Sequence, residues 1–279
     1  MLKSVSSMKG LTIKATDGEI GKVNQFLFDD ENWAVRYLVV DTGHWLDQRL
    51  VLISPIFIGQ ADWASEWLEV RLTKEQVANS PDIDTHQPVS RQHEAEYLNY
   101  FGYPYYWVDS GMWGGGLYPS MVAPIPAYVP PPPQPEKEAA DSHLWGTDDV
   151  TGYHVEATDG ELGHLVDFII DLETWAIVYV EIGTRNWLPG KKVLLSPQWI
   201  KTVKWLDAKV YAALTRESIK NAPEYAESKD ITREYETALH DHYGVPPYWS
   251  HGGRKPDDVA AGQGTPKPIV LDGGHLIRW

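Results

Sequence analysis

The chain has 279 residues, 43% of them hydrophobic, which is enough to build two cores of ordinary size. Its formal net charge of −15 opposes non-specific attraction to phosphate backbones, and no block of Lys or Arg would hold the chain at nucleic acid or at an anionic membrane. The absence of cysteine excludes disulfides, thiolate nucleophiles and thiolate metal sites.

Residues 1–9 lack the apolar core of a secretory signal, and Lys9 and Lys14 interrupt the sequence that follows. No run of about 18 apolar residues follows that would span a membrane. We therefore expect a cytoplasmic protein with no membrane span.

A five-residue sequence, Ala-Thr-Asp-Gly-Glu, occurs at residues 15–19 and again at residues 157–161. The shift between the two copies is 142 positions (157 − 15), and it holds without an insertion from residue 10 to residue 107 of the first copy. The chain is therefore predicted to be a tandem repeat. Asp-Gly between two strand-like runs favours a tight hairpin turn with positive φ, which glycine adopts without steric cost. The predicted turn-defining residues are Asp17, Gly18, Asp159 and Gly160.

Each copy contains short runs rich in β-branched and aromatic residues, which are typical of strands. In the first copy these runs cover residues 11–15, 20–28, 33–40, 51–55 and 67–72, and their counterparts in the second copy include residues 162–170, 175–182, 193–197 and 209–214. The inward-facing positions of the third strand are predicted to be Leu38, Val40, Val180 and Ile182. Because closure removes exposed sheet edges, five short strands with little helix between them predict a small antiparallel barrel in each copy.

Short helices are expected after each barrel, because capping residues border two helix-like segments. The expected N-caps are Thr73, Ser90, Thr215 and Thr232, and the expected C-caps are Gly102 and Gly244. The predicted organisation is a first barrel with its helices at residues 1–108, a Gly/Pro-rich linker at 109–146, a second barrel with its helices at 147–250 and a polar Gly/Pro tail at 251–279.

The order of motifs in both copies resembles the PRC-barrel family. It runs from Ala-Thr-Asp-Gly-Glu through Trp-Ala-(Val/Ile)-x-Tyr and Val-Leu-x-Ser-Pro to Leu-Thr-x-Glu, and the resemblance covers about residues 1–82 and 144–224. The family includes the cytoplasmic domain of the photosynthetic reaction-centre H subunit and the C-terminal domain of a ribosome maturation factor. The resemblance implies a mainly β protein with two PRC-type barrels in tandem, used for assembly and docking, without an active site shared by the family.

Two pairs of carboxylates, Asp17 with Glu19 and Asp159 with Glu161, are candidates for acid–base chemistry. Such chemistry requires environments that push the two pKa values apart. A solvated hairpin turn supplies no such difference, so a structural role in the turn is favoured.

A second candidate is the sequence His240-Asp241-His242, since imidazole and carboxylate groups are common metal ligands. Residues two apart on a helix point to nearly opposite sides, whereas chelating histidines favour a separation of three or four. We therefore expect no metal site, no cofactor and no catalytic residue, and a protein that is not an enzyme.

The aromatic residues are more informative, with 13 tryptophans and 15 tyrosines. An aromatic segment follows the longer helix of each copy, at residues 102–107 and 244–249. These segments either fold back onto the barrel or form a surface that meets the other barrel, another subunit or a partner, since Tyr and Trp are favoured at interface centres. The predicted partner-binding residues are Tyr105, Tyr106, Trp107, Tyr248, Trp249, Trp45 and Trp187.

The leading hypothesis is a non-enzymatic docking module in the bacterial cytoplasm. Its partner would be an unidentified protein or a second copy of the chain in a homo-oligomer, with no membrane partner and nucleic acid disfavoured. Two alternatives stay open: an RNA-processing or ribosome-assembly factor, by analogy with the family alone, and a metal- or small-ligand-binding sensor.

Overall fold

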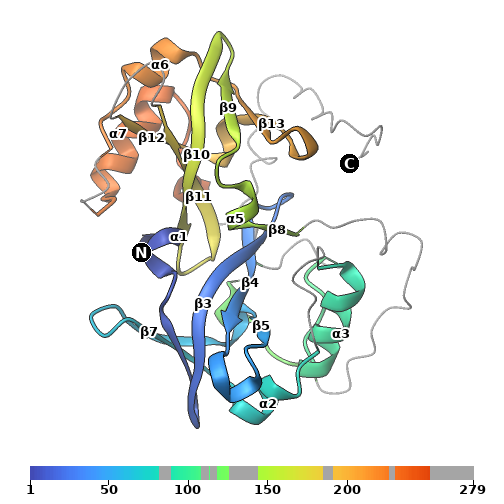
Figure 1. The fold of residues 1–279 in the computed structure, drawn as a ribbon. Helices are drawn as coiled ribbons and strands as arrows, with labels where there is room; N and C mark the ends of the chain where they lie inside the picture. The colour runs from blue at the N-terminus through green and yellow to red at the C-terminus, as the bar shows by residue number, and fades with distance from the viewer. Residues whose placement is uncertain are drawn as a thin grey trace. The chain divides into compact units, whose positions relative to one another are not determined.

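The computed structural model describes residues 1–81, 89–107, 113, 118–125, 144–184, 191–225 and 230–251. These residues form a mainly β protein, drawn in Figure 1, that divides into two compact units. Unit 1 comprises Met1, residues 3–149 and residues 171–176, and unit 2 comprises the other residues.

Among the described residues of unit 1, the strands form a hydrogen-bonded path in the order β6-β7-β2-β3-β4-β5. Their bounds are β2 (Thr12–Ala15), β3 (Gly18–Asp29), β4 (Ala34–Asp41), β5 (Leu50–Ile53), β6 (Ile58–Asp62) and β7 (Trp67–Val70), preceded by β1 (Leu2–Ser4). The long strand β3 pairs with β2 at its beginning and with β8 (Leu144–Gly146) at its end. Irregular register at two points along β3 lets this strand bend between those partners.

The strands of unit 2 repeat this order as β13-β14-β9-β10-β11-β12. Their bounds are β9 (His154–Ala157), β10 (Gly160–Asp171), β11 (Ala176–Gly183), β12 (Lys192–Leu195), β13 (Ile200–Lys204) and β14 (Lys209–Ala212).

The sheet corrects the expectation of closed antiparallel barrels in two respects. First, β2 pairs with β7 in parallel, and β9 pairs with β14 in parallel, so the sheet is mixed. The parallel pairing arises because the β6–β7 hairpin follows β5 and returns alongside β2 in the same direction as that strand. Second, the path is not closed, since no pairing joins β5 to β6 or β12 to β13 within the described ranges.

The helix ends follow the local capping signals. The side chains of Thr73, Ser90, Thr215 and Thr232 each accept a hydrogen bond from the backbone N–H three residues later, as predicted. Gly102 (φ +70°) and Gly244 (φ +65°) end the two long helices in the left-handed conformation, also as predicted. The helices are α1 (Val5–Met8), α2 (Lys74–Ala78), α3 (Arg91–Phe101), α5 (Thr147–Val150), α6 (Arg216–Lys220) and α7 (Arg233–Tyr243), with 3-10 turns η1 (Gly43–Leu46), η2 (Pro55–Phe57), η3 (Pro119–Met121), η4 (Pro197–Trp199), η5 (Trp205–Asp207) and η6 (Tyr248–His251).

The central strand of each unit is buried on both faces. Residues 34–40 of β4 and 177–182 of β11 are buried without alternation, so the predicted inward positions Leu38, Val40, Val180 and Ile182 are confirmed as core. In unit 1, α3 covers this core beside β5, where the Tyr97 hydroxyl donates to the carbonyl of Leu52 (3.1 Å). In unit 2, α7 buries Leu239 and His240, so the long helix of each unit is part of its core.

The predicted linker, residues 109–146, lies mostly outside the described residues, and its last three residues form β8. Of the predicted tail, residues 252–279 lie outside them as well.

Candidate functional site

In unit 1 the aromatic segment after α3 folds back along the helix. The Tyr105 hydroxyl accepts a hydrogen bond from the Asn99 side-chain amide (2.9 Å), and the Tyr105 ring stacks on Trp107 with 4.7 Å between ring centres. Tyr105 and Tyr106 are only 6% and 5% exposed. These two tyrosines therefore contact their own unit, while Trp107 is half-buried.

A buried ion pair on α3 holds this segment. Arg91 and Glu94, one helical turn apart, form an ion pair with Nη1 3.1 Å from Oε1. Arg91 also donates to the Tyr106 hydroxyl (2.7 Å), and that hydroxyl donates to the second carboxylate oxygen of Glu94. The Arg91 guanidinium lies 4.6 Å from the centre of the Trp107 ring, a cation–π distance.

Unit 2 builds a similar arrangement from residues 142 positions later (233 − 91), with an arginine side chain that is 54% exposed. Arg233 and Glu236 pair at 3.0 Å, and the Tyr248 hydroxyl donates to Glu236 at 2.9 Å. The Arg233 guanidinium lies 3.9 Å from the centre of the Trp249 ring. We refer to Arg91, Glu94, Tyr106 and Trp107, and to Arg233, Glu236, Tyr248 and Trp249, as the helix–aromatic clusters of the two units.

Unit 1 adds a second buried cation to its cluster. Arg36 on β4 is 1% exposed, and its Nε donates to the buried carboxylate of Asp29. The Arg36 guanidinium stacks on Tyr106 at 3.9 Å and on Trp113 at 4.8 Å from the ring centres. At the position of Arg36, unit 2 has Val178, so this ion pair belongs to unit 1 alone.

Unit 2 instead places a histidine beside its cluster. His240 is 1% exposed and occupies the position of Leu98 in unit 1. Its Nε2 lies 3.0 Å from the Tyr179 hydroxyl, and its Nδ1 lies 3.2 Å from the carbonyl of Val245. Burial lowers the pKa of His240 below its ordinary value, and the Val245 carbonyl opposes that change.

Burial also shifts the acid–base equilibria of the unit 1 cluster. It raises the pKa of the Glu94 carboxyl, although the charge of Arg91 and the hydrogen bond from Tyr106 oppose the change. Burial opposes the charge of Arg91, but Tyr106 and Glu94 outweigh it and hold the pKa of Arg91 above its ordinary value. Burial, reinforced by the Glu94 charge, raises the pKa of the Tyr37 and Tyr106 hydroxyls.

The other predicted partner-binding residues lie in different surroundings. Tyr248 and Trp249 are half-buried in the unit 2 cluster. Trp45 is half-buried in unit 1, where its indole N–H donates to the carbonyl of Ile20 and the Lys74 ammonium lies 4.4 Å from the ring centre. Trp187 lies outside the described residues.

The repeated acidic turn also contacts the start of a helix in each unit, a contact that the sequence does not predict. The turn residues are Thr16 and Asp17, and Gly18 (φ +143°) is the first residue of β3. The predicted Asp-Gly turn is therefore displaced by one residue. The Asp17 carboxylate accepts a hydrogen bond from the first backbone N–H of α2, at Lys74 (2.8 Å), and so joins the hairpin to the helix.

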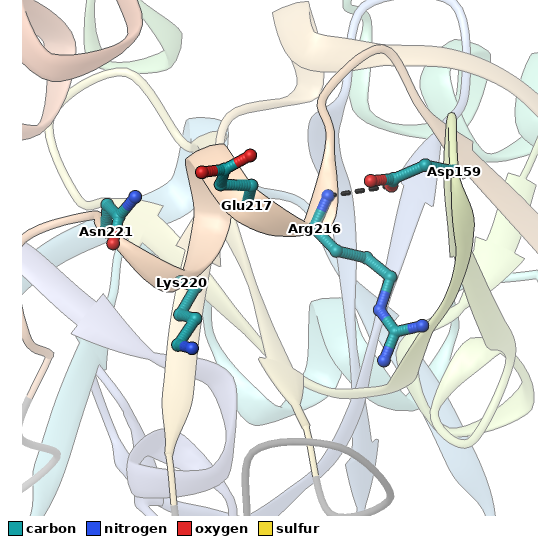
Figure 2. Close-up of a pocket in the computed structure, with 5 residues that line it drawn as sticks. All are labelled: Asp159, Arg216, Glu217, Lys220 and Asn221. Carbon is teal, nitrogen blue, oxygen red and sulfur yellow. Dashed lines mark hydrogen bonds between the residues drawn. The ribbon is translucent and has the colours of Figure 1, made fainter.

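The equivalent turn in unit 2 borders a shallow surface hollow of about 420 Å³. Figure 2 shows the Asp159 carboxylate bonded to the backbone N–H of Arg216 (2.8 Å), while the Arg216, Glu217 and Lys220 side chains do not converge on one point. Acidic and basic side chains line this hollow and no hydrophobic residue is among them, unlike the mostly hydrophobic lining of a typical small-molecule pocket. Its lining residues are Asp159, Arg216, Glu217, Lys220 and Asn221.

The two histidines of the candidate metal site have different surroundings. His240 is buried in the unit 2 core, whereas His242 is exposed and its Nε2 lies 2.7 Å from the carbonyl of Ser218. No group of three or more His, Cys, Asp or Glu side chains in the described ranges is arranged to hold a metal ion.

Comparison with known protein families gives a match within the first part of the chain. Residues 2–77 contain a PRC-barrel domain. This PRC-barrel domain spans β1 to β7 and ends within α2, so the helix–aromatic cluster of unit 1 lies after it. No curated protein matches the chain. Among the helices of the described segments, none has the length and apolar character needed to cross a membrane.

The residues that anchor the aromatic segments were not among the predicted site residues. Arg91 and Glu94 recur in the second copy at the same shift as the turn motif, so a comparison of the two copies could have identified them. Arg36 carried no such signal, because it has no counterpart in the second copy and meets Asp29 and Tyr106 only in the folded unit.

Proposed function

We propose that the protein is a non-enzymatic docking or assembly module made of two PRC-barrel domains in tandem, and that it works in the cytoplasm. The PRC-barrel domain at residues 2–77 is compatible with this role. The tandem arrangement is supported by the strand order of unit 2, which repeats that of unit 1, and by the constant shift of 142 residues between the copies (157 − 15).

The observation that carries the proposal is the helix–aromatic cluster, which is present in both units. In each, a buried glutamate accepts from the tyrosine, and an arginine stacks on the following tryptophan. These contacts hold Trp107 and Trp249, and both residues stay only half-buried. A fixed, half-exposed tryptophan loses little side-chain entropy on binding, and tryptophan is enriched among residues that dominate interface energies.

The proposed partner is a protein, either a second copy of the chain or a different polypeptide. Sedimentation velocity of the full chain measures self-association, and affinity capture with the tagged full chain measures binding of another protein. We expect the double variant Trp107→Ala, Trp249→Ala to weaken the association about 30-fold or more, the effect of losing one or two interface anchors.

The matched control is Leu206→Ala, which removes an apolar side chain that is 98% exposed on η5, outside both clusters. This control is expected to associate like the wild type. Full association of the double variant, with far-ultraviolet circular dichroism unchanged, would contradict the proposal, and loss of association in Leu206→Ala alone would place the docking surface elsewhere.

A further inference from the structure

Two histidines face each other across neighbouring strands of unit 2. His154 on β9 lies directly opposite His164 on β10 in the antiparallel register, and these strands run side by side in Figure 1. Their ring centres are 4.5 Å apart and their ring planes are inclined by 48°. His154 is exposed and His164 is half-buried, so a hydrated ion can reach both rings.

We propose that His154 and His164 form a binding site for one divalent transition-metal ion, with Cu²⁺ as the best-fitting ion. Imidazole suits Cu²⁺, Ni²⁺ and Zn²⁺, and Cu²⁺ binds most tightly in the general order of divalent ions. The site is separate from the helix–aromatic clusters and does not depend on the docking function.

The separation of the rings fits two adjacent positions around one ion. A metal–nitrogen bond of about 2.0–2.1 Å puts an ion about 3.2 Å from the ring centre, so two imidazoles at a right angle have centres about 4.5 Å apart. A right angle between neighbouring ligands is the geometry of tetragonal Cu²⁺ and Ni²⁺ sites. The observed separation of the ring centres, 4.5 Å, equals this value.

The neighbouring charges leave the site open to a cation. Lys209 on β14 lies beside His154 in the parallel register, and its ammonium pairs with the Glu156 carboxylate at 3.0 Å. This pairing offsets the positive charge of Lys209. Since the described residues contain no group of three metal-binding side chains, the remaining positions around the ion would be filled by water.

The first copy supplies a natural control. At the positions of the two histidines it has Thr12 and Lys22, which also lie opposite each other in the register. A threonine and a lysine therefore fit this position of the sheet in unit 1. There the positively charged Lys22 takes the place of one of the two proposed metal ligands. Exchange of His154→Thr and His164→Lys is expected to keep the fold while removing both ligands.

Isothermal titration of the full chain with CuCl₂ and ZnCl₂ at about pH 7.5 tests the proposal. We expect one Cu²⁺ per chain bound at this site, and each of His154→Thr and His164→Lys should weaken that binding at least about 10-fold. His44→Asn removes an exposed histidine from unit 1 and gives it the residue of the second copy, so this control should bind Cu²⁺ like the wild type.

Electron paramagnetic resonance of the Cu²⁺-loaded chain separates the pair from a single-histidine site. Nitrogen couplings from two imidazoles are expected in the wild type, and from one in each single variant. No Cu²⁺ binding by the wild type, equal binding in all variants, or loss of binding in only one of the two histidine variants would overturn the proposal.

Discussion

Glu94 is 1% exposed, and its buried carboxylate connects the other members of the unit 1 cluster. Its two oxygens accept from Arg91 and from Tyr106, so the helix and the aromatic segment depend on the same side chain. A buried carboxylate with these partners is costly to leave unpaired, which explains why the arginine and the tyrosine recur together in unit 2.

The raised pKa of Glu94 makes part of the stability depend on pH. The folded state binds the proton more tightly than the unfolded chain, whose carboxyl has a pKa of about 4.5. Stability from this group is therefore full below the unfolded pKa and is lost as the pH rises through the folded pKa. In Glu94→Gln, which keeps the size and an acceptor oxygen, this dependence disappears.

Urea unfolding followed by tryptophan fluorescence between about pH 4 and pH 7 measures the effect. The free energy of unfolding of the wild type, minus that of Glu94→Gln, is expected to fall as the pH rises, by about 1.4 kcal/mol for each unit by which the folded pKa is raised. Glu96→Gln on the exposed face of α3 is the control and should leave the pH dependence unchanged. A difference that stays constant or grows with pH would show that Glu94 is not destabilised by burial.

Among the elements, the pairing of β3 with β4 in unit 1 includes a close approach of two backbones. A Cβ atom on Gly21 of β3 would overlap the backbone carbonyl of Asp41 at the end of β4. The same conflict exists between Gly163 and Gly183 in unit 2. These glycines are therefore required by the close approach of two backbones.

Gly21→Ala is expected to lower the free energy of unfolding by at least about 2 kcal/mol, because the two strands must separate to admit the methyl group. Gly59→Ala on β6 is the matched control, since a Cβ atom there would lie 3.6 Å from the nearest atom, the carbonyl oxygen of Glu69, and its effect should stay within about 1 kcal/mol. Urea unfolding of both variants gives the comparison, and equal losses would refute the close-approach argument.

Elements whose ends depend on local chemistry were predictable, and elements defined by distant pairing were not. The caps of α3 and α7 follow from residues adjacent in sequence, so Ser90 and Gly102 could be located from the chain alone. Strand β6 was missed because Gly59, Gln60 and Ala61 are exposed and show no apolar alternation. The parallel pairing of β2 with β7 joins residues such as Thr12 and Trp67, which no local signal connects.

In the candidate site, the sequence predicted the aromatic residues but not the arginines and glutamates that hold them. Trp107 and Trp249 stood out by residue type, whereas the orientation of each ring depends on an arginine at the start of the preceding helix, along which the aromatic segment folds back. The opposed pair His154 and His164 was also hidden, because the register of β9 on β10 brings together residues separated by a turn.

At the scale of the whole molecule, the excess of acidic residues is the property that separates the proposed docking function from an RNA-directed one. The chain has 39 Asp and Glu residues against 24 Lys and Arg. In each helix–aromatic cluster the arginine is already paired with a glutamate, so these arginines are engaged within their own units.

We predict that the full chain does not bind ribosomal subunits or RNA through their phosphates. Such binding gains its free energy from counterions released by clustered Lys and Arg, and a net charge of −15 makes the approach to a polyanion repulsive instead. Co-sedimentation with purified ribosomal subunits at about 50 mM salt, where this electrostatic attraction is strongest, should leave the protein in the supernatant. The ribosomal subunits with a basic RNA-binding protein serve as the positive control.

A fraction of the chain that pellets with the subunits at low salt and is released at about 200 mM salt would contradict the prediction, because this response is that of phosphate contacts. A fraction that pellets equally at both salt concentrations would point to docking on a ribosomal protein, and the Trp107→Ala, Trp249→Ala variant would then decide whether the helix–aromatic clusters make that contact.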